Sequence, residues 1–129
     1  MSGVILDASA LLALLNDEPG SDKIAAVLAE SKMSVLNFAE VAGHFYKLGM
    51  SDQQVEAILR PLPIEIIPAD QALAWDAARL RPLTIDAGLS LGDRFCLALA
   101  RRENLPAWTA DKVWGSVAAV VGTEIVVIR

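Results

Sequence analysis

Four acidic residues stand where a carboxylate could take part in chemistry. Asp7 and Asp111 come at the ends of short apolar runs, Asp93 opens an apolar helix-forming segment, and Glu40 follows a third apolar run. Carboxylates that are brought together cannot all ionise unless a cation lies among them. Because carboxylate oxygens are hard ligands, they favour Mg²⁺ or Mn²⁺, and Mg²⁺ in turn suits phosphodiester hydrolysis. The four acids therefore predict a divalent metal centre, provided that the fold gathers them.

Each Asp of this set also has a structural explanation. Asp is a favoured N-cap, so Asp7 and Asp111 could simply begin helices. Asp93 stands three residues after Ser90, which fits a capping box. Against capping alone, Asp93 shares a helical stripe with apolar residues, and an acid directed toward a core needs a cation or strong donors.

Glu40 is the weakest candidate when it is taken alone. It lies on the polar side of a predicted helix together with Asn37, His44 and Lys47. That pattern is typical of a solvated face, on which a contact between Glu40 and His44 would account for the acid. The hypothesis of a metal centre therefore rests on the combination of the four residues.

The elements that must position these acids alternate along the chain. Strands are expected at residues 4–6, 33–36, 64–67, 106–109 and 124–128, and helices at 8–15, 21–30, 37–48, 51–61, 70–81, 91–103 and 111–117, with a loop at 82–89. This order predicts a single α/β domain over residues 1–129, with a parallel sheet of about five strands covered by helices on both faces. Ligands of such sheets bind beyond the carboxyl ends of the strands, where Asp7 and Asp111 fall.

The composition limits the classes of function. Sixteen acids face eleven bases, and this net charge of −5 argues against non-specific coating of nucleic acid by charge alone. The hydrophobic fraction of 54% is high for a small monomer, which favours self-association. No apolar run approaches the roughly 18 residues needed to span a bilayer. The single cysteine, Cys96, and a start without the pattern of a signal peptide lead us to expect a cytosolic protein without a membrane segment.

Four segments around the acids match the pattern of a known family. They are Ile5-Leu6-Asp7-Ala8-Ser9-Ala10-Leu11, Asn37-Phe38-Ala39-Glu40-Val41, Gly88-Leu89-Ser90-Leu91-Gly92-Asp93-Arg94 and Trp108-Thr109-Ala110-Asp111-Lys112-Val113-Trp114. In this order they resemble the PIN-domain ribonucleases, and specifically the VapC-type toxins of bacterial toxin–antitoxin pairs. The resemblance spans nearly the whole chain. The family more commonly has Phe where this chain has Trp114, a departure that concerns packing.

The resemblance implies an activity, a site and partners. It implies a Mg²⁺- or Mn²⁺-dependent endoribonuclease that acts on RNA as the toxin of a toxin–antitoxin pair. It also implies a cognate antitoxin, from which we expect a basic side chain to enter the acid cluster, and a homodimer. Ser9 and Thr109 would hydrogen-bond within the centre. The metal-binding and catalytic residues would be Asp7, Glu40, Asp93 and Asp111.

Other functions compete with this hypothesis. The segment Gly88-Leu89-Ser90-Leu91-Gly92 matches the nucleophile elbow of serine hydrolases. In that fold the catalytic His follows the Ser, whereas the only histidine, His44, precedes Ser90. Aspartyl-phosphate chemistry usually needs a second acid close by, and Ser9 stands at the position where it is expected. A non-catalytic binding module of the same fold is a further alternative, against which the presence of all four acids argues.

Two basic residues follow the acids directly. Arg94 comes after Asp93 and Lys112 after Asp111, so these two are the bases best placed to contact a phosphate. A solvated, charge-balancing role is the alternative for each of them. The sequence does not indicate which RNA would be cut, because recognition of loops and single strands depends on surface shape.

Overall fold

One parallel sheet organises the molecule. The computed structural model describes residues 3–129, so Met1 and Ser2 of the predicted 1–129 domain lie outside the described residues. The sheet has the strand order β3-β2-β1-β4-β5, with every pair parallel. Its strands are β1 (Val4–Leu6), β2 (Ser31–Ser34), β3 (Glu65–Ile67), β4 (Ala107–Thr109) and β5 (Ile125–Val127). The predicted α/β fold with five parallel strands is confirmed.

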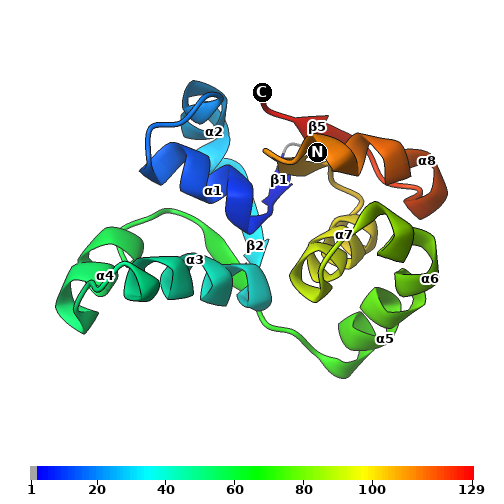
Figure 1. Ribbon diagram of the computed structural model, residues 1–129, viewed down its shortest axis with the longest axis horizontal. Helices are drawn as coiled ribbons and strands as arrows, with labels where there is room; N and C mark the ends of the chain where they lie inside the picture. Colours follow the sequence, from blue (N-terminus) through cyan, green and yellow to red (C-terminus); the bar gives the residue numbers. More distant parts are fainter. Residues whose placement is uncertain (1–2) are drawn as a thin grey trace.

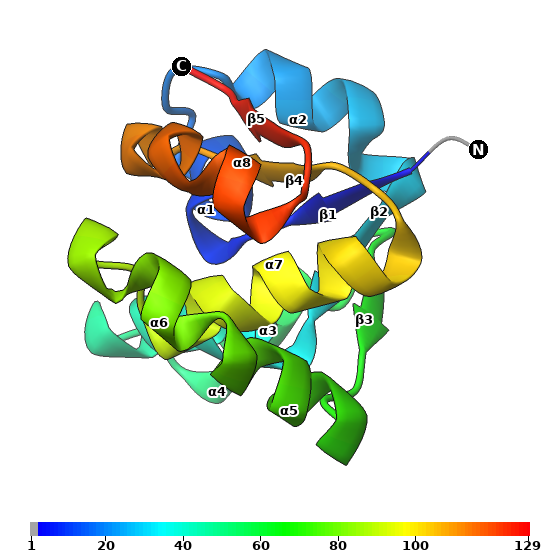
Figure 2. The ribbon, with the colours of Figure 1, turned by 90° about the vertical axis from the view of Figure 1, so that its right-hand side faces the viewer.

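Helices cover both faces of the sheet (Figure 1; Figure 2 shows a perpendicular view). One group comprises α1 (Ala8–Leu15), α2 (Ser21–Val27), η1 (Leu28–Glu30), α3 (Val35–Lys47) and α4 (Asp52–Leu59). The other comprises α5 (Gln71–Arg79), α6 (Arg81–Thr84), η2 (Ile85–Ala87), α7 (Leu91–Glu103), η3 (Lys112–Val117) and α8 (Ala118–Val121). Within residues 3–129, no helix is both long enough and apolar enough to cross a membrane.

The central strand β1 contributes to two separate hydrophobic cores. Successive side chains of a strand point to opposite faces of its sheet. Ile5 packs in the core that α5 and α7 cover, whereas Val4 and Leu6 pack in the core that α1 and α3 cover. All three side chains are buried. Burial on both faces explains why this strand is apolar at every position, and why it ends at the first polar residue, Asp7.

Two local predictions were wrong. The strand expected at 33–36 is β2 (Ser31–Ser34), and α3 begins at Val35 because Ser34 caps it: the Ser34 hydroxyl accepts a hydrogen bond from the Leu36 N–H at 3.2 Å. The loop expected at 82–89 contains α6 and η2. Pro82 stands in the first turn of α6, where its missing N–H costs no hydrogen bond.

The order of the strands creates one crossover point. The chain passes from β1 to β2 and β3 on one side, and then returns to place β4 on the other side of β1. Ligands of open α/β sheets bind at such a point, beyond the carboxyl ends of the strands. Asp7 directly follows β1, and Asp111 comes two residues after β4. The fold thus brings the first and the last of the four acids to the same end of the sheet, beyond two neighbouring strands.

The left-handed conformation of Gly20 gives a prediction for stability. Its φ is +96°, and a Cβ added there would lie 2.8 Å from the backbone oxygen of Ile128. We expect Gly20→Ala to lower the free energy of unfolding by more than about 1 kcal/mol, as measured by urea denaturation. Gly49→Ala is the matched control, because Gly49 has φ +88° and none of the described residues comes within 4 Å of its added Cβ. Equal losses in the two variants would contradict the predicted clash.

Candidate active site

Asp7 is held at the carboxyl end of β1 by donors from helix α1 and strand β4. Its side chain is only 3% exposed. Oδ1 accepts hydrogen bonds from the Ala10 N–H and the Ser9 hydroxyl, both at 2.8 Å, and Oδ2 accepts one from the Thr109 hydroxyl at 2.6 Å. The bond from Ala10 makes Asp7 the N-cap of α1, so the structural explanation of this residue is correct. Capping alone does not require the two hydroxyls.

Ser9 and Thr109 connect the ends of β1 and β4 through the same carboxylate. The Ser9 hydroxyl accepts a hydrogen bond from the Ala110 N–H at 3.0 Å, and the Thr109 hydroxyl accepts one from the Asp111 N–H, also at 3.0 Å. Each hydroxyl also lies within hydrogen-bond distance of Asp7 as a donor, and the two hydroxyl oxygens are 3.2 Å apart. The hydrogen bonds expected of Ser9 and Thr109 are therefore present, and their role in a metal centre stays a prediction.

The environment of Asp7 opposes its negative charge. Burial raises the pKa of this carboxyl to about 7, although hydrogen bonds from Thr109, Ala10 and Ser9 act in the opposite direction. The negative charge of Asp93 raises the pKa further. A cation beside this carboxyl would favour the ionised form and so lower its pKa.

Asp93 lies in the first turn of α7 and forms a capping box with Ser90. The carboxylate Oδ2 accepts a hydrogen bond from the Ser90 N–H at 2.9 Å, and the Ser90 hydroxyl accepts one from the Asp93 N–H at 3.2 Å. Burial raises the pKa of Asp93, and the charge of Asp111 adds to that rise. Because η2 and not a strand precedes Gly88, and the Ser90 hydroxyl caps α7, the structure argues against a nucleophile elbow.

Glu40 lies against the first turn of α7. Its Oε1 accepts a hydrogen bond from the Asn37 side-chain amide at 2.8 Å, and the same amide donates to the Gly92 carbonyl at 3.1 Å. A Cβ added to Gly92 would stand 2.6 Å from both carboxylate oxygens of Glu40. Asn37 is completely buried, whereas Glu40 and Lys47 are exposed, so the solvated face expected for this helix does not include Asn37. Among residues 3–129, Asn37 and not His44 is the hydrogen-bond partner of Glu40.

Asp111 is exposed and caps η3 through a hydrogen bond from the Val113 N–H to Oδ1 at 3.0 Å.

Asp93 is the acid whose charge interacts with the other three. Its charge raises the pKa of Asp7 and of Glu40, although burial is the larger cause for both, and Asp111 acts on Asp93 in the same way. The charges of the four acids are therefore linked pairwise through Asp93.

The donor set fits a hydrated hard cation better than a closed metal cage. Among residues 3–129, no three side chains of His, Cys, Asp or Glu lie close enough to form a ready-made metal site. Mg²⁺ does not need one, since it usually keeps several waters and binds one or two carboxylates together with substrate phosphates. Oxygen donors of raised pKa around a buried carboxylate match that requirement.

Sequence reasoning missed the role of Asn37 as the hydrogen-bond partner of Glu40. Asn37 stands three residues before Glu40, a helical spacing that could have identified it as a partner.

Arg94 was expected to be a phosphate contact or a solvated charge, and both expectations were wrong: it is 7% exposed and donates to the Leu89 carbonyl at 2.9 Å. Cys96 is a buried thiol, as expected; burial, followed by the charges of nearby acids, raises its pKa. Lys112 is exposed beside Asp111.

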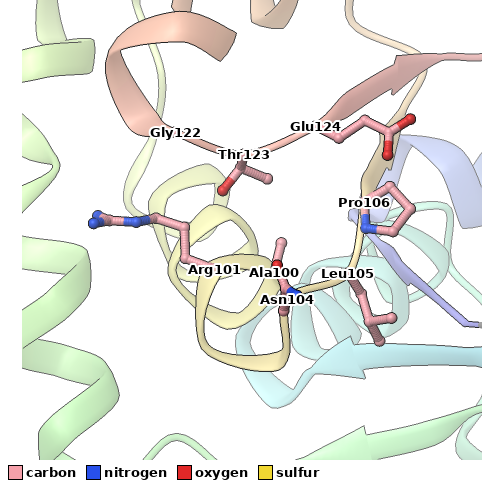
Figure 3. A pocket seen from close by; sticks show the side chains of 8 residues that line it. All are labelled: Ala100, Arg101, Asn104, Leu105, Pro106, Gly122, Thr123 and Glu124. Atoms are coloured by element: carbon pink, nitrogen blue, oxygen red, sulfur yellow. The ribbon is translucent and has the colours of Figure 1, made fainter. Parts of the chain in front are cut away.

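The cavity shown in Figure 3 is separate from the acids. It has a volume of about 210 Å³ and lies between Asn104, which ends α7, and the residues Thr123 and Glu124, which precede β5. It therefore opens at the amino ends of β4 and β5, whereas the acid cluster follows the carboxyl ends of the strands. We do not include this cavity in the candidate active site.

The raised pKa of Asp7 predicts how the stability of the metal-free protein depends on pH. The folded state binds more protons than the unfolded state between the ordinary pKa of 3.8 and about 7. The free energy of unfolding should therefore fall as the pH rises through that window. Urea denaturation without divalent cations, from about pH 5 to about pH 8, measures this slope.

In the same series Asp7→Asn should give a flatter curve, because the titrating group is removed. Glu40 and Asp93 are still present in that variant. Because their pKa values are also raised, they still make the free energy of unfolding fall as the pH rises. A slope in Asp7→Asn that equals the slope of the wild type would contradict the assignment of this pH dependence to Asp7.

Comparisons with known proteins place this geometry in a family. Residues 4–120 match the family model of the PIN domain, and a comparison with curated proteins returned no match. The structure resembles a toxin–antitoxin complex from Klebsiella pneumoniae, with a TM-score of 0.74, 19% identity and 98% of each chain covered. It also resembles VapBC2 from Rickettsia felis bound to promoter DNA, with a TM-score of 0.72, 17% identity and coverage of 99% of this chain and 100% of the other.

A third similar structure is VapBC-5 of the toxin–antitoxin systems of Mycobacterium tuberculosis, with a TM-score of 0.64, 21% identity and coverage of 98% of this chain and 100% of the other. At these identities the similarity concerns the fold. The family model, by contrast, covers most of the chain, including all four acids. On this basis, the chain belongs to the PIN domain family.

Proposed function

We propose that this protein is a metal-dependent endoribonuclease and the toxin of a toxin–antitoxin pair. The observation that carries the proposal is the buried carboxylate of Asp7 at the crossover point, with Asp93 near enough to raise its pKa and with Glu40 and Asp111 each interacting with Asp93. Membership of the PIN domain family and similarity to toxin–antitoxin complexes support it. Homodimer formation and a cytosolic location stay predictions.

The four acids are the residues proposed to hold Mg²⁺ or Mn²⁺. When it is bound, such a cation lowers the pKa of a coordinated water and stabilises the leaving oxygen of a phosphodiester. The protein's own groups orient the carboxylates beforehand. Among residues 3–129, the hydrogen bonds to Glu40, Asp93 and Asp111 each engage one carboxylate oxygen, which leaves the other oxygen of each for a cation or a water.

RNA is the proposed substrate. The exposed Lys112 directly follows Asp111 and is the base best placed to bind a phosphate beside the acids. Arg94 is not available for that role because it is buried. With a net charge of −5, the protein must attract RNA through local basic groups and the bound cation, since its overall charge repels the substrate.

Substitution of the acids tests the catalytic proposal. Asp7→Asn and Asp93→Asn should each lower RNA cleavage by at least about 100-fold, because the loss of a ligand weakens metal binding and misplaces the attacking water. The measurement is cleavage of total RNA by purified protein with Mg²⁺, followed by mapping of the 5′ ends. EDTA should abolish cleavage by the wild type.

The matched control for these variants is Asp22→Asn, an exposed acid of α2. It should cleave RNA like the wild type, and circular dichroism should show the native fold for all three variants. Cleavage at the wild-type rate by Asp7→Asn would contradict the assignment of the site. A wild-type protein that folds and binds the metal but cleaves no RNA would favour the binding-module alternative.

Gly92 offers a test that leaves every acid in place. In Gly92→Ala the new Cβ would lie only 2.6 Å from both carboxylate oxygens of Glu40, which is too close for the carboxylate to stay in place. Because the obstacle is the end of a flexible side chain, the protein should fold while Glu40 moves away from Asn37. We expect cleavage to fall by at least about 10-fold, since displaced catalytic groups lose their productive geometry.

Gly43→Ala is the control for this substitution. Gly43 lies in the same helix as Glu40, and none of the described residues comes within 4 Å of its added Cβ. This variant should cleave RNA normally and be slightly more stable, because Ala favours a helix more than Gly does. Normal cleavage by Gly92→Ala would show that the observed position of Glu40 is not needed for activity.

The proposed partner is an antitoxin that inserts an Arg among the acids, where bidentate hydrogen bonds to carboxylates are available. A groove of about 230 Å³ lies beside Leu11, Phe38, Leu59 and Ile64 and offers an apolar surface to an amphipathic helix of the same partner. The inserted Arg and the metal would then occupy the same site. Inhibition should therefore weaken as the metal concentration rises.

A competition experiment tests this insertion. The affinity of the cognate antitoxin is measured over a Mn²⁺ series, with the wild-type antitoxin and with a variant in which the inserted Arg is replaced by Ala. The wild-type antitoxin should bind more weakly at high Mn²⁺, and the variant should lose this dependence. Affinities that ignore Mn²⁺ for both forms would mean that the antitoxin acts by steric cover elsewhere.

A further inference from the structure

The guanidinium of Arg94 is buried, and no carboxylate of residues 3–129 is hydrogen-bonded to it. Among the described residues, Leu89 is its hydrogen-bond acceptor, through the backbone carbonyl at 2.9 Å, and the buried Nε has no hydrogen-bond partner. Arg is almost never fully buried unless it is paired, because desolvation of the charge is costly. A side chain retained in this state needs a physical reason.

The peptide bond between Leu89 and Ser90 supplies that reason. Its carbonyl accepts the hydrogen bond from Arg94, and its N–H donates to Oδ2 of Asp93 at 2.9 Å. One peptide group therefore lies between a guanidinium and a carboxylate, with its dipole aligned to both charges. Hydrogen bonds in such a chain polarise and strengthen one another.

We propose that Arg94 is a positioning residue for Asp93. By holding the Leu89 carbonyl, it fixes the orientation in which the Ser90 N–H binds Oδ2 of Asp93, so that Oδ1 is left for the acid cluster. The peptide needs such an anchor because Gly88, immediately before it, has φ +79° and lies at the end of a short turn. The consequence for metal binding rests on the proposed function, whereas the consequence for the Ser90 N–H does not.

Arg94 is suited to this task because its planar guanidinium is always charged and its donors have a fixed geometry. Lys at this position would keep a charge and a donor on a more flexible stem. Arg101 of the same helix is exposed and provides a matched control of the same residue type.

The first measurement uses the metal-free protein. In Arg94→Met the Ser90 amide proton should move upfield in the ¹H–¹⁵N NMR spectrum and exchange faster with solvent, because its bond to Asp93 weakens. In Arg101→Met it should be unchanged. An unchanged Ser90 amide in a folded Arg94→Met protein would overturn the proposal, whether or not the protein binds a metal.

The second measurement is a double-mutant cycle on Mn²⁺ affinity, determined by titration calorimetry without RNA. Arg94→Met should weaken Mn²⁺ binding by at least about 10-fold, which is the usual scale for residues that orient a ligand. Arg94→Lys should weaken it less, and Arg101→Met should leave it unchanged. In an Asp93→Asn background, Arg94→Met should change the affinity by less than about twofold, because its effect passes through Asp93.

The outcomes separate the two proposals. Failure of the wild type to bind Mn²⁺ would count against the proposed function, and the Ser90 amide would still test the role of Arg94. Equal losses of affinity in both backgrounds would show that Arg94 acts on the fold in general, and no loss in either would show that it does not act on the site. If Arg94→Met does not fold, Arg94→Lys is taken through the same cycle and is judged by the same comparison.

Discussion

The burial of one carboxylate at the crossover between β1 and β4 is the constraint on which the rest of the site depends. Asp7 is nearly inaccessible, and its two oxygens are occupied by donors from α1, from Ser9 and from Thr109. Those donors hold the two central strands at a fixed spacing. The polar cost of the arrangement is offset only in part, because burial still raises the pKa of Asp7 to about 7.

The other three acids differ from Asp7, and from one another, in how deeply they are buried. Asp93 is partly buried, whereas Glu40 and Asp111 are exposed. Each is fixed by a donor of different origin: a backbone N–H before α7, a buried amide from α3 and the first turn of η3. Since these elements come from both helical layers, the site is a product of the whole fold and not of one loop.

Much of this arrangement could be predicted because local chemistry determines it. Apolar runs alternating with helical periodicity indicate a parallel sheet, and Asp7 and Ser90 mark helix starts that the structure contains. Where a short apolar run suits either a strand or a helix, the prediction failed: β2 ends before Val35 because Ser34 caps the next helix.

The environments of Glu40 and Arg94 could not be predicted, because contacts between distant segments decide them. Helical periodicity places Asn37 and Glu40 on a polar face, but that face meets Gly92, more than fifty residues further along the chain. Arg94 likewise looks like an ordinary surface base until the Leu89 carbonyl and its burial are known. In both cases a buried polar side chain, Asn37 or Arg94 itself, makes the decisive contact, against the usual distribution of residue types.

The double use of Asp7 and Asp111, as proposed metal ligands and as helix caps, has a consequence for which substitutions can accumulate at these positions. Asn caps a helix about as well as Asp, whereas Ala in that position costs roughly 1 kcal/mol of stability. Many substitutions that remove one of these carboxylates would therefore also reduce the amount of folded protein. Conversion of Asp to Asn needs a single base change and preserves the cap, so a lineage can lose the carboxylate while keeping a folded chain. We therefore expect relatives that have lost one of these two carboxylates to carry Asn there more often than Ala.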